Sequence, residues 1–99
     1  MEITVNKNGT KLTISPIGRV DTTTAPELQA AVDENIGGVT DLTFDLKKLN
    51  YLSSAGLRVL MSAQKIMNKQ GKMTIRNVCP EIMDIFDVTG FVDILNIEE

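Results

Sequence analysis

Residues 50–60 of this 99-residue chain read NYLSSAGLRVL. The chain turns at residues 47–50, and the two serines then stand where a helix of about residues 55–70 begins. Serine is a preferred helix N-cap because its oxygen accepts a hydrogen bond from a free N–H of the first turn. That turn also carries a positive partial charge that favours anions. The stretch therefore predicts an exposed serine hydroxyl beside a site suited to a phosphate group.

Upstream of this stretch, the sequence opens with two short strands. Apolar residues alternate or cluster in residues 2–6 and 11–20, and Asn8-Gly9 between them is a strong turn signal. These segments predict an antiparallel hairpin. Pro16 weakens the second strand and predicts either an edge position or a bulge there.

A first helix follows the hairpin. Thr24 is placed to cap it, Glu27 to reciprocate three residues later, and Pro26 falls in the first turn, where its missing N–H costs nothing. Gly37-Gly38 ends the helix. One apolar face is predicted from the spacing of Leu28, Val32 and Ile36.

The remaining segments alternate between strand and helix. Residues 40–46 and 72–77 are predicted strands, residues 80–89 a third helix, and residues 91–97 a short final strand or turn. The order β-β-α-β-α-β-α-β predicts one α/β domain over residues 1–99, with a mixed, mostly parallel sheet, an N-terminal β-hairpin and three helices.

Composition limits the classes of function. The net charge is −3, charges of both signs are scattered along the chain, and no dense basic cluster is present, so neither nucleic acid nor a membrane surface is an expected partner. No apolar run is long enough for a signal peptide or a membrane span. Cys79 is the only cysteine, so it cannot form an intramolecular disulfide. We expect a cytoplasmic protein.

The sequence lacks the usual means of catalysis. It has no histidine, and it contains no phosphate-binding glycine loop and no nucleophile elbow. Asp21 and Asp45 are expected near the ends of two strands, where they would form either a magnesium site or ordinary turns and caps. No metal and no cofactor is predicted, and the protein is not expected to be an enzyme.

The serine segment resembles the phosphorylation motif of bacterial anti-sigma-factor antagonists, which are members of the STAS-domain family. The common form of that motif is Asp-Ser-Ser-Gly-Leu, and it is often extended by Val-Leu. Further segments are similar to the family in the expected order: residues 18–21 with 24–28, residues 44–60, and Asn77-Val78-Cys79-Pro80 with the following Ile85-Phe86 and Thr89-Gly90-Phe91.

This resemblance implies partner switching. Aligned on Gly56, the phosphoacceptor falls on Ser54, the preceding acid is replaced by Ser53, and the second serine becomes Ala55. If Ser53 took the phosphate instead, the site would shift by one residue. The unmodified protein would bind an anti-sigma factor, usually a serine kinase of the histidine-kinase-like ATPase fold, and so release the sigma factor. Phosphorylation would break the complex, and a metal-dependent serine phosphatase would restore it.

A helical wheel divides the second helix into faces. One arc is expected to face the sheet: Gly56, Val59, Leu60, Ala63, Ile66 and Met67. Arg58, Lys65 and Lys69 lie opposite, as a solvated surface or a contact for an acidic partner. Leu57 and Met61 form an apolar pair that is either a partner contact or part of a broad core. The expected partner-binding residues are Asp21, Thr22, Ser53, Ser54, Ala55, Gly56, Leu57, Arg58 and Met61.

Two other functions stay open from the sequence. Ser53 in place of the acid is compatible with a non-switching STAS scaffold or regulatory subunit, in a stress-signalling assembly or beside a transporter. A small nucleotide-binding module is the other alternative, although no phosphate cradle beyond the helix start supports it.

Overall fold

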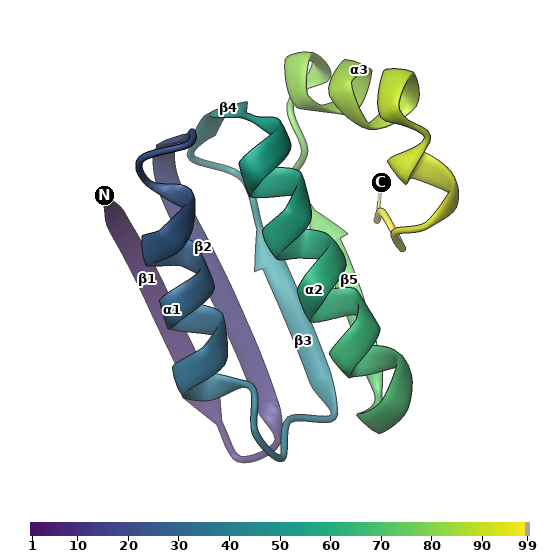
Figure 1. The fold of residues 1–99 in the computed structure, drawn as a ribbon. Coiled ribbons are helices and arrows are strands. Elements are labelled where there is room, and N and C mark those ends of the chain that lie inside the picture. Colours follow the sequence, from purple (N-terminus) through teal and green to yellow (C-terminus); the bar gives the residue numbers. More distant parts are fainter. Residues whose placement is uncertain (99) are drawn as a thin grey trace.

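A five-stranded sheet lies behind two long helices in the computed structural model, which describes residues 1–98 (Figure 1). The strands are β1 (Glu2–Asn8), β2 (Lys11–Val20), β3 (Asp41–Asp45), β4 (Leu49–Leu52) and β5 (Lys72–Arg76). The helices are α1 (Ala25–Asn35), α2 (Ser54–Gln70), α3 (Pro80–Thr89) and the short 3-10 helix η1 (Phe91–Asp93).

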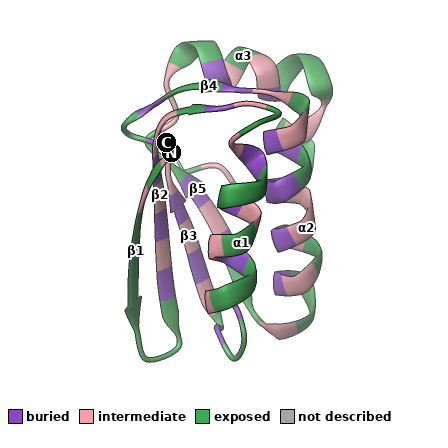
Figure 2. Ribbon diagram, turned by 60° about the vertical axis from the view of Figure 1, so that its left-hand side comes forward, coloured by how far each residue is buried: buried purple, intermediate pink, exposed green. Residues whose placement is uncertain are grey.

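The sheet has the order β1-β2-β3-β5, and β4 pairs with the far end of β2. β1 and β2 form the predicted antiparallel hairpin, whereas β2, β3 and β5 run parallel. The helices α1 and α2 cover the same face of the sheet, and α3 lies across its upper end, beside β4 (Figures 1 and 2). The prediction of a mixed, mostly parallel sheet with three helices is confirmed.

The core lies between the sheet and the two covering helices (Figure 2). Alternate strand residues point to the same face, so buried residues alternate along most of β2 and throughout β3 and β5: these are Leu12, Ile14, Pro16, Val20, Leu42, Phe44, Met73 and Ile75. The predicted apolar stripe of α1 is buried against them: Leu28 and Val32 within the helix, and Ile36 at its C-cap.

The strand β4 was not predicted, because a turn was expected at residues 47–50. The chain does turn at Lys47 and Lys48, but Leu49 and Leu52 are both buried and pair beside β2. The two buried residues are three positions apart, so the period-two signal of a strand is missing. For residues 91–97, where a short final strand or a turn was predicted, the structure has the turn: η1 and the residues after it, with a single bridge between Ile97 and Ile75.

The position of Pro16 differs from both expectations. It lies in an interior strand, opposite Ile3 of β1, and the irregularity in pairing falls between Gly18 and Arg19. On its other side, β2 pairs with β3 through residues 11–14 and with β4 from Gly18. Pro16 therefore lies between two partners, where its missing N–H removes no bond to β3 or β4.

Candidate functional site

The predicted phosphoacceptor Ser54 is the exposed first residue of α2, where β4 meets that helix. Ser53 is the N-cap: its hydroxyl oxygen accepts a hydrogen bond from the Gly56 N–H at 3.4 Å, and its own N–H donates to the Val20 carbonyl at 2.8 Å. The Ser54 hydroxyl forms no hydrogen bond with any group in residues 1–98. Ser53 is thus occupied in holding the helix start, and the Ser54 hydroxyl is available beside the first-turn N–H groups.

Gly56 and Leu57, two of the predicted partner-binding residues, lie in the core. A Cβ atom on Gly56 would overlap the Leu52 side chain and approach Cγ1 of Val20 to 2.8 Å. Leu57 is only 5% exposed. The first turn of α2 therefore packs directly on the ends of β2 and β4, and neither residue contributes to the surface around Ser54.

Asp21 closes a tight turn directly after β2. Its carboxylate oxygen Oδ1 accepts hydrogen bonds from the N–H groups of Thr23 and Thr24, both at 3.0 Å, and from the Thr23 hydroxyl at 2.8 Å. Because Val20, the residue before it, binds the Ser53 N–H, this turn lies beside the start of α2. Thr22 stands exposed at the turn. The structure thus brings Asp21 and Thr22 to the predicted serine site.

The predicted capping box at α1 is wrong. The Thr24 hydroxyl oxygen accepts a hydrogen bond from the Asp21 N–H at 2.8 Å, and the hydroxyl donates to the Arg19 carbonyl at 3.0 Å. It forms no hydrogen bond with the N–H groups of the helix start, so it does not cap α1. The Glu27 carboxylate instead accepts from the N-terminal ammonium group at 3.2 Å. The Thr24 oxygen therefore accepts the Asp21 N–H in place of a helix N–H, and its hydroxyl hydrogen is directed back toward the Arg19 carbonyl and the Asp21 carboxylate.

The hydrogen bonds from Thr23 and Thr24 lower the pKa of Asp21 from 3.8 to about 2. A depressed carboxyl pKa favours the folded state above the unfolded value of 3.8, and this contribution is lost as the pH falls through about 2. We expect the carboxyl carbon of Asp21 to titrate with a midpoint near 2 in an NMR pH series. The Asp21→Asn variant should lack the loss of folding stability at low pH that protonation of Asp21 causes in the wild type. A midpoint at the ordinary 3.8 would contradict the assignment.

An aromatic and a basic residue flank the site, and sequence reasoning missed this pair. The Arg19 guanidinium lies 4.5 Å from the centre of the Tyr51 ring, and the two residues are register partners in β2 and β4. Tyr51 is 38% exposed, three residues before Ser54. The signal in the sequence was a tyrosine two residues before Ser53, but its partner could be found only once β4 was known.

Asp45 serves a turn, as does Asp21. Its Oδ1 accepts from the Lys47 N–H at 3.1 Å and from the Asn77 side-chain amide at 2.9 Å. Residues 1–98 contain no cluster of three acidic, cysteine or histidine side chains that could hold a metal ion. Asp21 and Asp45 were expected to form either a magnesium site or ordinary turns and caps, and their hydrogen bonds support turns and caps.

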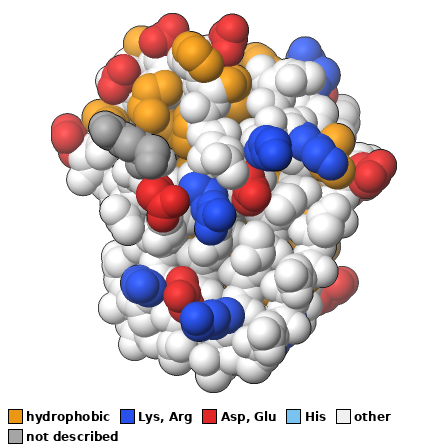
Figure 3. All heavy atoms as spheres, turned by 180° about the vertical axis from the view of Figure 1, so that it is seen from behind, with side chains coloured by type: hydrophobic (Ala, Val, Ile, Leu, Met, Phe, Trp, Pro, Cys, Tyr) orange, Lys and Arg blue, Asp and Glu red, His pale blue; other side chains and the backbone are white. Residues whose placement is uncertain are grey.

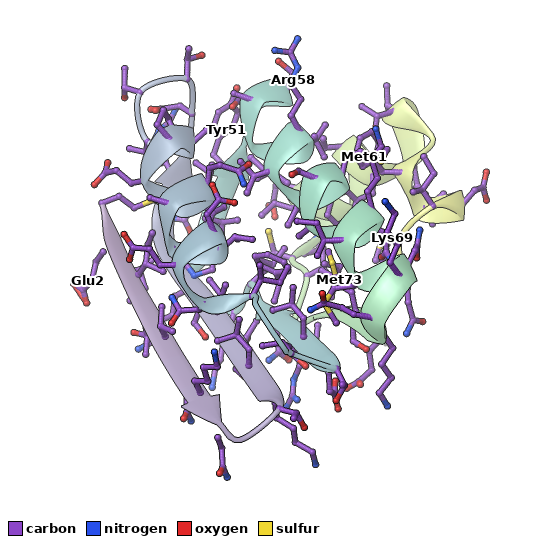
Figure 4. The ribbon with its side chains drawn as sticks, turned by 60° about the horizontal axis from the view of Figure 1, so that its bottom comes forward. Glu2, Tyr51, Arg58, Met61, Lys69 and Met73 are labelled. Carbon is purple, nitrogen blue, oxygen red and sulfur yellow. The ribbon has the colours of Figure 1, made fainter. Side chains whose placement is uncertain are left out.

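The outer face of α2 follows the helical wheel closely. Arg58, Lys65 and Lys69 are exposed, and Arg58, Met61 and Lys69 follow one another along the helix in Figure 4. Met61 is half-buried, unlike Leu57, so the predicted apolar pair is divided between surface and core. Ile66, expected in the core, is also only partly buried.

No helix within residues 1–98 has the length and apolar character needed to cross a membrane.

Comparisons with known proteins identify the family. The model of the STAS domain matches residues 2–99. The anti-sigma-B factor antagonist of Bacillus subtilis is 29% identical over 98 residues, which cover 98% of this chain and 90% of that protein.

Solved structures agree on the fold. An anti-sigma factor antagonist from Mycobacterium paratuberculosis superposes with a TM-score of 0.87 at 22% identity, covering 97% of this chain and 83% of that one. SpoIIAA of Bacillus, solved in its phosphorylated form, superposes with a TM-score of 0.76 at 16% identity, covering 99% of this chain and 92% of that one. From the family match over nearly its whole length, this chain belongs to the STAS domain family.

Proposed function

We propose that this protein is an anti-sigma-factor antagonist whose binding is switched off by phosphorylation of Ser54. The observation that carries the proposal is the exposed, unbonded Ser54 hydroxyl at the N-terminus of a long helix whose cap is supplied by Ser53. The names of its relatives support the partner class, and SpoIIAA, a structural neighbour, has been solved in a phosphorylated form.

Ser54 is a better phosphoacceptor than Ser53 for a geometric reason. The Ser53 hydroxyl is half-buried and its oxygen already accepts the Gly56 N–H, whereas the Ser54 hydroxyl is exposed and has no hydrogen-bond partner within residues 1–98, so a kinase can reach it more easily. A phosphate on Ser54 would also meet the positive end of α2, which stabilises an anion there. The same argument explains how Ser53 can replace the acid of the family motif, since serine caps a helix as an aspartate does.

The partners follow from this function. The unmodified protein would bind an anti-sigma factor that is a serine kinase of the histidine-kinase-like ATPase fold, and a metal-dependent serine phosphatase would reverse the modification. Both steps occur in the cytoplasm, and this protein catalyses neither. The contact surface would comprise the residues around Ser54 that remain accessible: Asp21, Thr22, Ser53, Ala55, Arg58 and Met61.

The direct test is modification by the cognate kinase with ATP, followed by phosphopeptide mapping. One phosphate on Ser54 is expected, and Ser54→Ala should abolish it while Ser53→Ala leaves it. Phosphate on Ser53, or modification that persists in Ser54→Ala, would overturn the assignment. Binding of a kinase without any modification would favour the scaffold function.

The contact surface is tested by Met61→Lys. Because Met61 is half-buried in an open groove, the ammonium group can reach water, and we expect a stability loss of less than about 1 kcal/mol. Affinity for the anti-sigma factor should fall about tenfold or more, measured by titration calorimetry. The matched contrast is Leu57→Ala in the core, which should cost about 2–5 kcal/mol of stability. Unchanged affinity in Met61→Lys would remove Met61 from the contact.

A further inference from the structure

Charge is divided between two parts of this chain and is not scattered along it as expected. Residues 1–76 contain all ten basic residues and seven acidic ones, whereas residues 77–99 contain six acidic residues and no basic one. The division is sharpest between neighbouring helices. α2 has three basic residues and no acid, while α3 and η1 have four acids and no base: Glu81, Asp84, Asp87 and Asp93.

The positive surface is a groove beside α2. It has a volume of about 450 Å³ and is lined by Arg58, Met61, Ser62, Lys65, Ile66 and Phe91. Its apolar side chains are only partly buried, and within residues 1–98 neither Arg58 nor Lys65 forms an ion pair. The groove thus offers apolar contact area beside two cations that have no acidic partner among the described residues.

The negative surface is a patch on α3 and η1, which we define by Asp84, Asp87, Val88, Val92 and Ile94. Val88 is 87% exposed, Val92 40% and Ile94 47%, whereas the opposite side of α3 buries Ile82 and Phe86. From behind the molecule, apolar side chains gather where α3 and η1 lie, with acidic side chains along their outer edge, while the basic side chains on this face lie below and to the right (Figure 3). Exposed apolar residues grouped within a charged rim are typical of an interaction surface.

We propose that the patch of one copy of this chain binds in the α2 groove of a second copy. The two surfaces complement each other in apolar contact area and in charge. The exposed valines would cover Met61, Ile66 and Phe91, and the carboxylates would face Arg58 and Lys65. Opposite potentials of this kind bring partners together and set their orientation. Each copy carries both surfaces, so the contact can form twice across a two-fold axis or once, head to tail.

This association does not depend on the proposed function, but it would affect it. Arg58 and Met61 line the groove and also belong to the surface proposed for the anti-sigma factor. A second copy bound there would compete with the anti-sigma factor, and the self-associated protein would act as a reserve that is released on dilution.

Analytical ultracentrifugation of the purified protein tests the proposal. At low salt, the weight-average mass should rise with protein concentration, and salt of about 0.5 M should reverse the rise because it screens charges beyond a few ångströms. Asp87→Lys and Lys65→Glu should each weaken the association by about tenfold or more, since each sets like charges against one another. Glu34→Lys is the matched control for Asp87→Lys: it makes the same charge change at an exposed residue of α1 and should leave the association unchanged.

Mixing the two variants gives the decisive result. An equimolar mixture of Asp87→Lys and Lys65→Glu pairs the intact groove of one with the intact patch of the other, so the association should return. Circular dichroism melting of each variant verifies that it is folded. A wild-type protein that stays monomeric, an equal loss in Glu34→Lys, or a mixture that stays monomeric would each overturn the proposal.

Discussion

A phosphate on Ser54 will lower the affinity of this protein for its anti-sigma factor by about two to three decades while the backbone stays unchanged. The phosphate brings a charge of about −1.5 to −2 at neutral pH. Within the protein, the N–H groups of the first turn of α2 and the helix dipole stabilise it, by up to ~2 kcal/mol. At the contact, a dianion replaces a neutral hydroxyl and must lose its hydration. A loss of ~3–4 kcal/mol there gives the stated fall in affinity.

The measurement is a titration of the anti-sigma factor with plain and phosphorylated protein, together with amide NMR spectra of both. Ser54→Asp should reproduce the effect only in part, because a carboxylate has less charge and fewer acceptor oxygens than a phosphate. Chemical-shift changes should be confined to residues near the start of α2 and the adjoining Asp21 turn. Equal affinities, or large shifts in β5 and α3, would contradict this mechanism.

Gly71→Ala will destabilise the fold by about 3 kcal/mol, because the added methyl group has no room beside Thr40. Gly71 ends α2, and its N–H donates to the Met67 carbonyl at 2.7 Å. An added Cβ atom would overlap the Thr40 carbonyl oxygen and lie 2.6 Å from its carbon. These are backbone atoms, and the same oxygen accepts the Lys72 N–H at 3.0 Å, so the chain cannot move aside without disturbing the start of β5.

Gly37→Ala is the matched control for this prediction. Gly37 follows α1, and a Cβ atom there would meet nothing within 4 Å. We expect a change of less than about 0.5 kcal/mol, as for most surface substitutions. Urea unfolding gives the free energy of unfolding of Gly71→Ala, Gly37→Ala and the wild type, provided that the dependence on urea concentration has the same slope in all three. Similar midpoints for the two alanine variants would show that the contact with Thr40 relaxes at little cost.

Much of the fold could be predicted because its signals are local. Asn8-Gly9 set the hairpin, and the apolar spacing in α1 and α2 identified their buried faces. The start of α2 was placed within one residue from Ser53 and Ser54. Such signals depend on neighbours within a turn or two, which a single sequence displays.

The rest depended on contacts between distant segments. β4 is four residues long and exists because β2 changes partner along its length, which no local pattern reveals. The Thr24 cap failed because Asp21 captured that hydroxyl, a competition between two reasonable local structures. Leu57 and Met61 looked equivalent on the wheel, but Leu57 is buried in the core whereas Met61 lines an open groove beside Phe91, which only the packing of distant segments decides.

The hydrogen bond from the Ser53 N–H to the Val20 carbonyl ties the serine site to β2. Val20 is fully buried, and β2 pairs with three other strands. Because the acceptor is held within the sheet, this bond opens only when the start of α2 moves away from β2, and the Ser53 amide should therefore be protected from exchange with deuterium. A kinase or partner would then meet one fixed shape at Ser54, and the energy for any adjustment on binding must come from the partner.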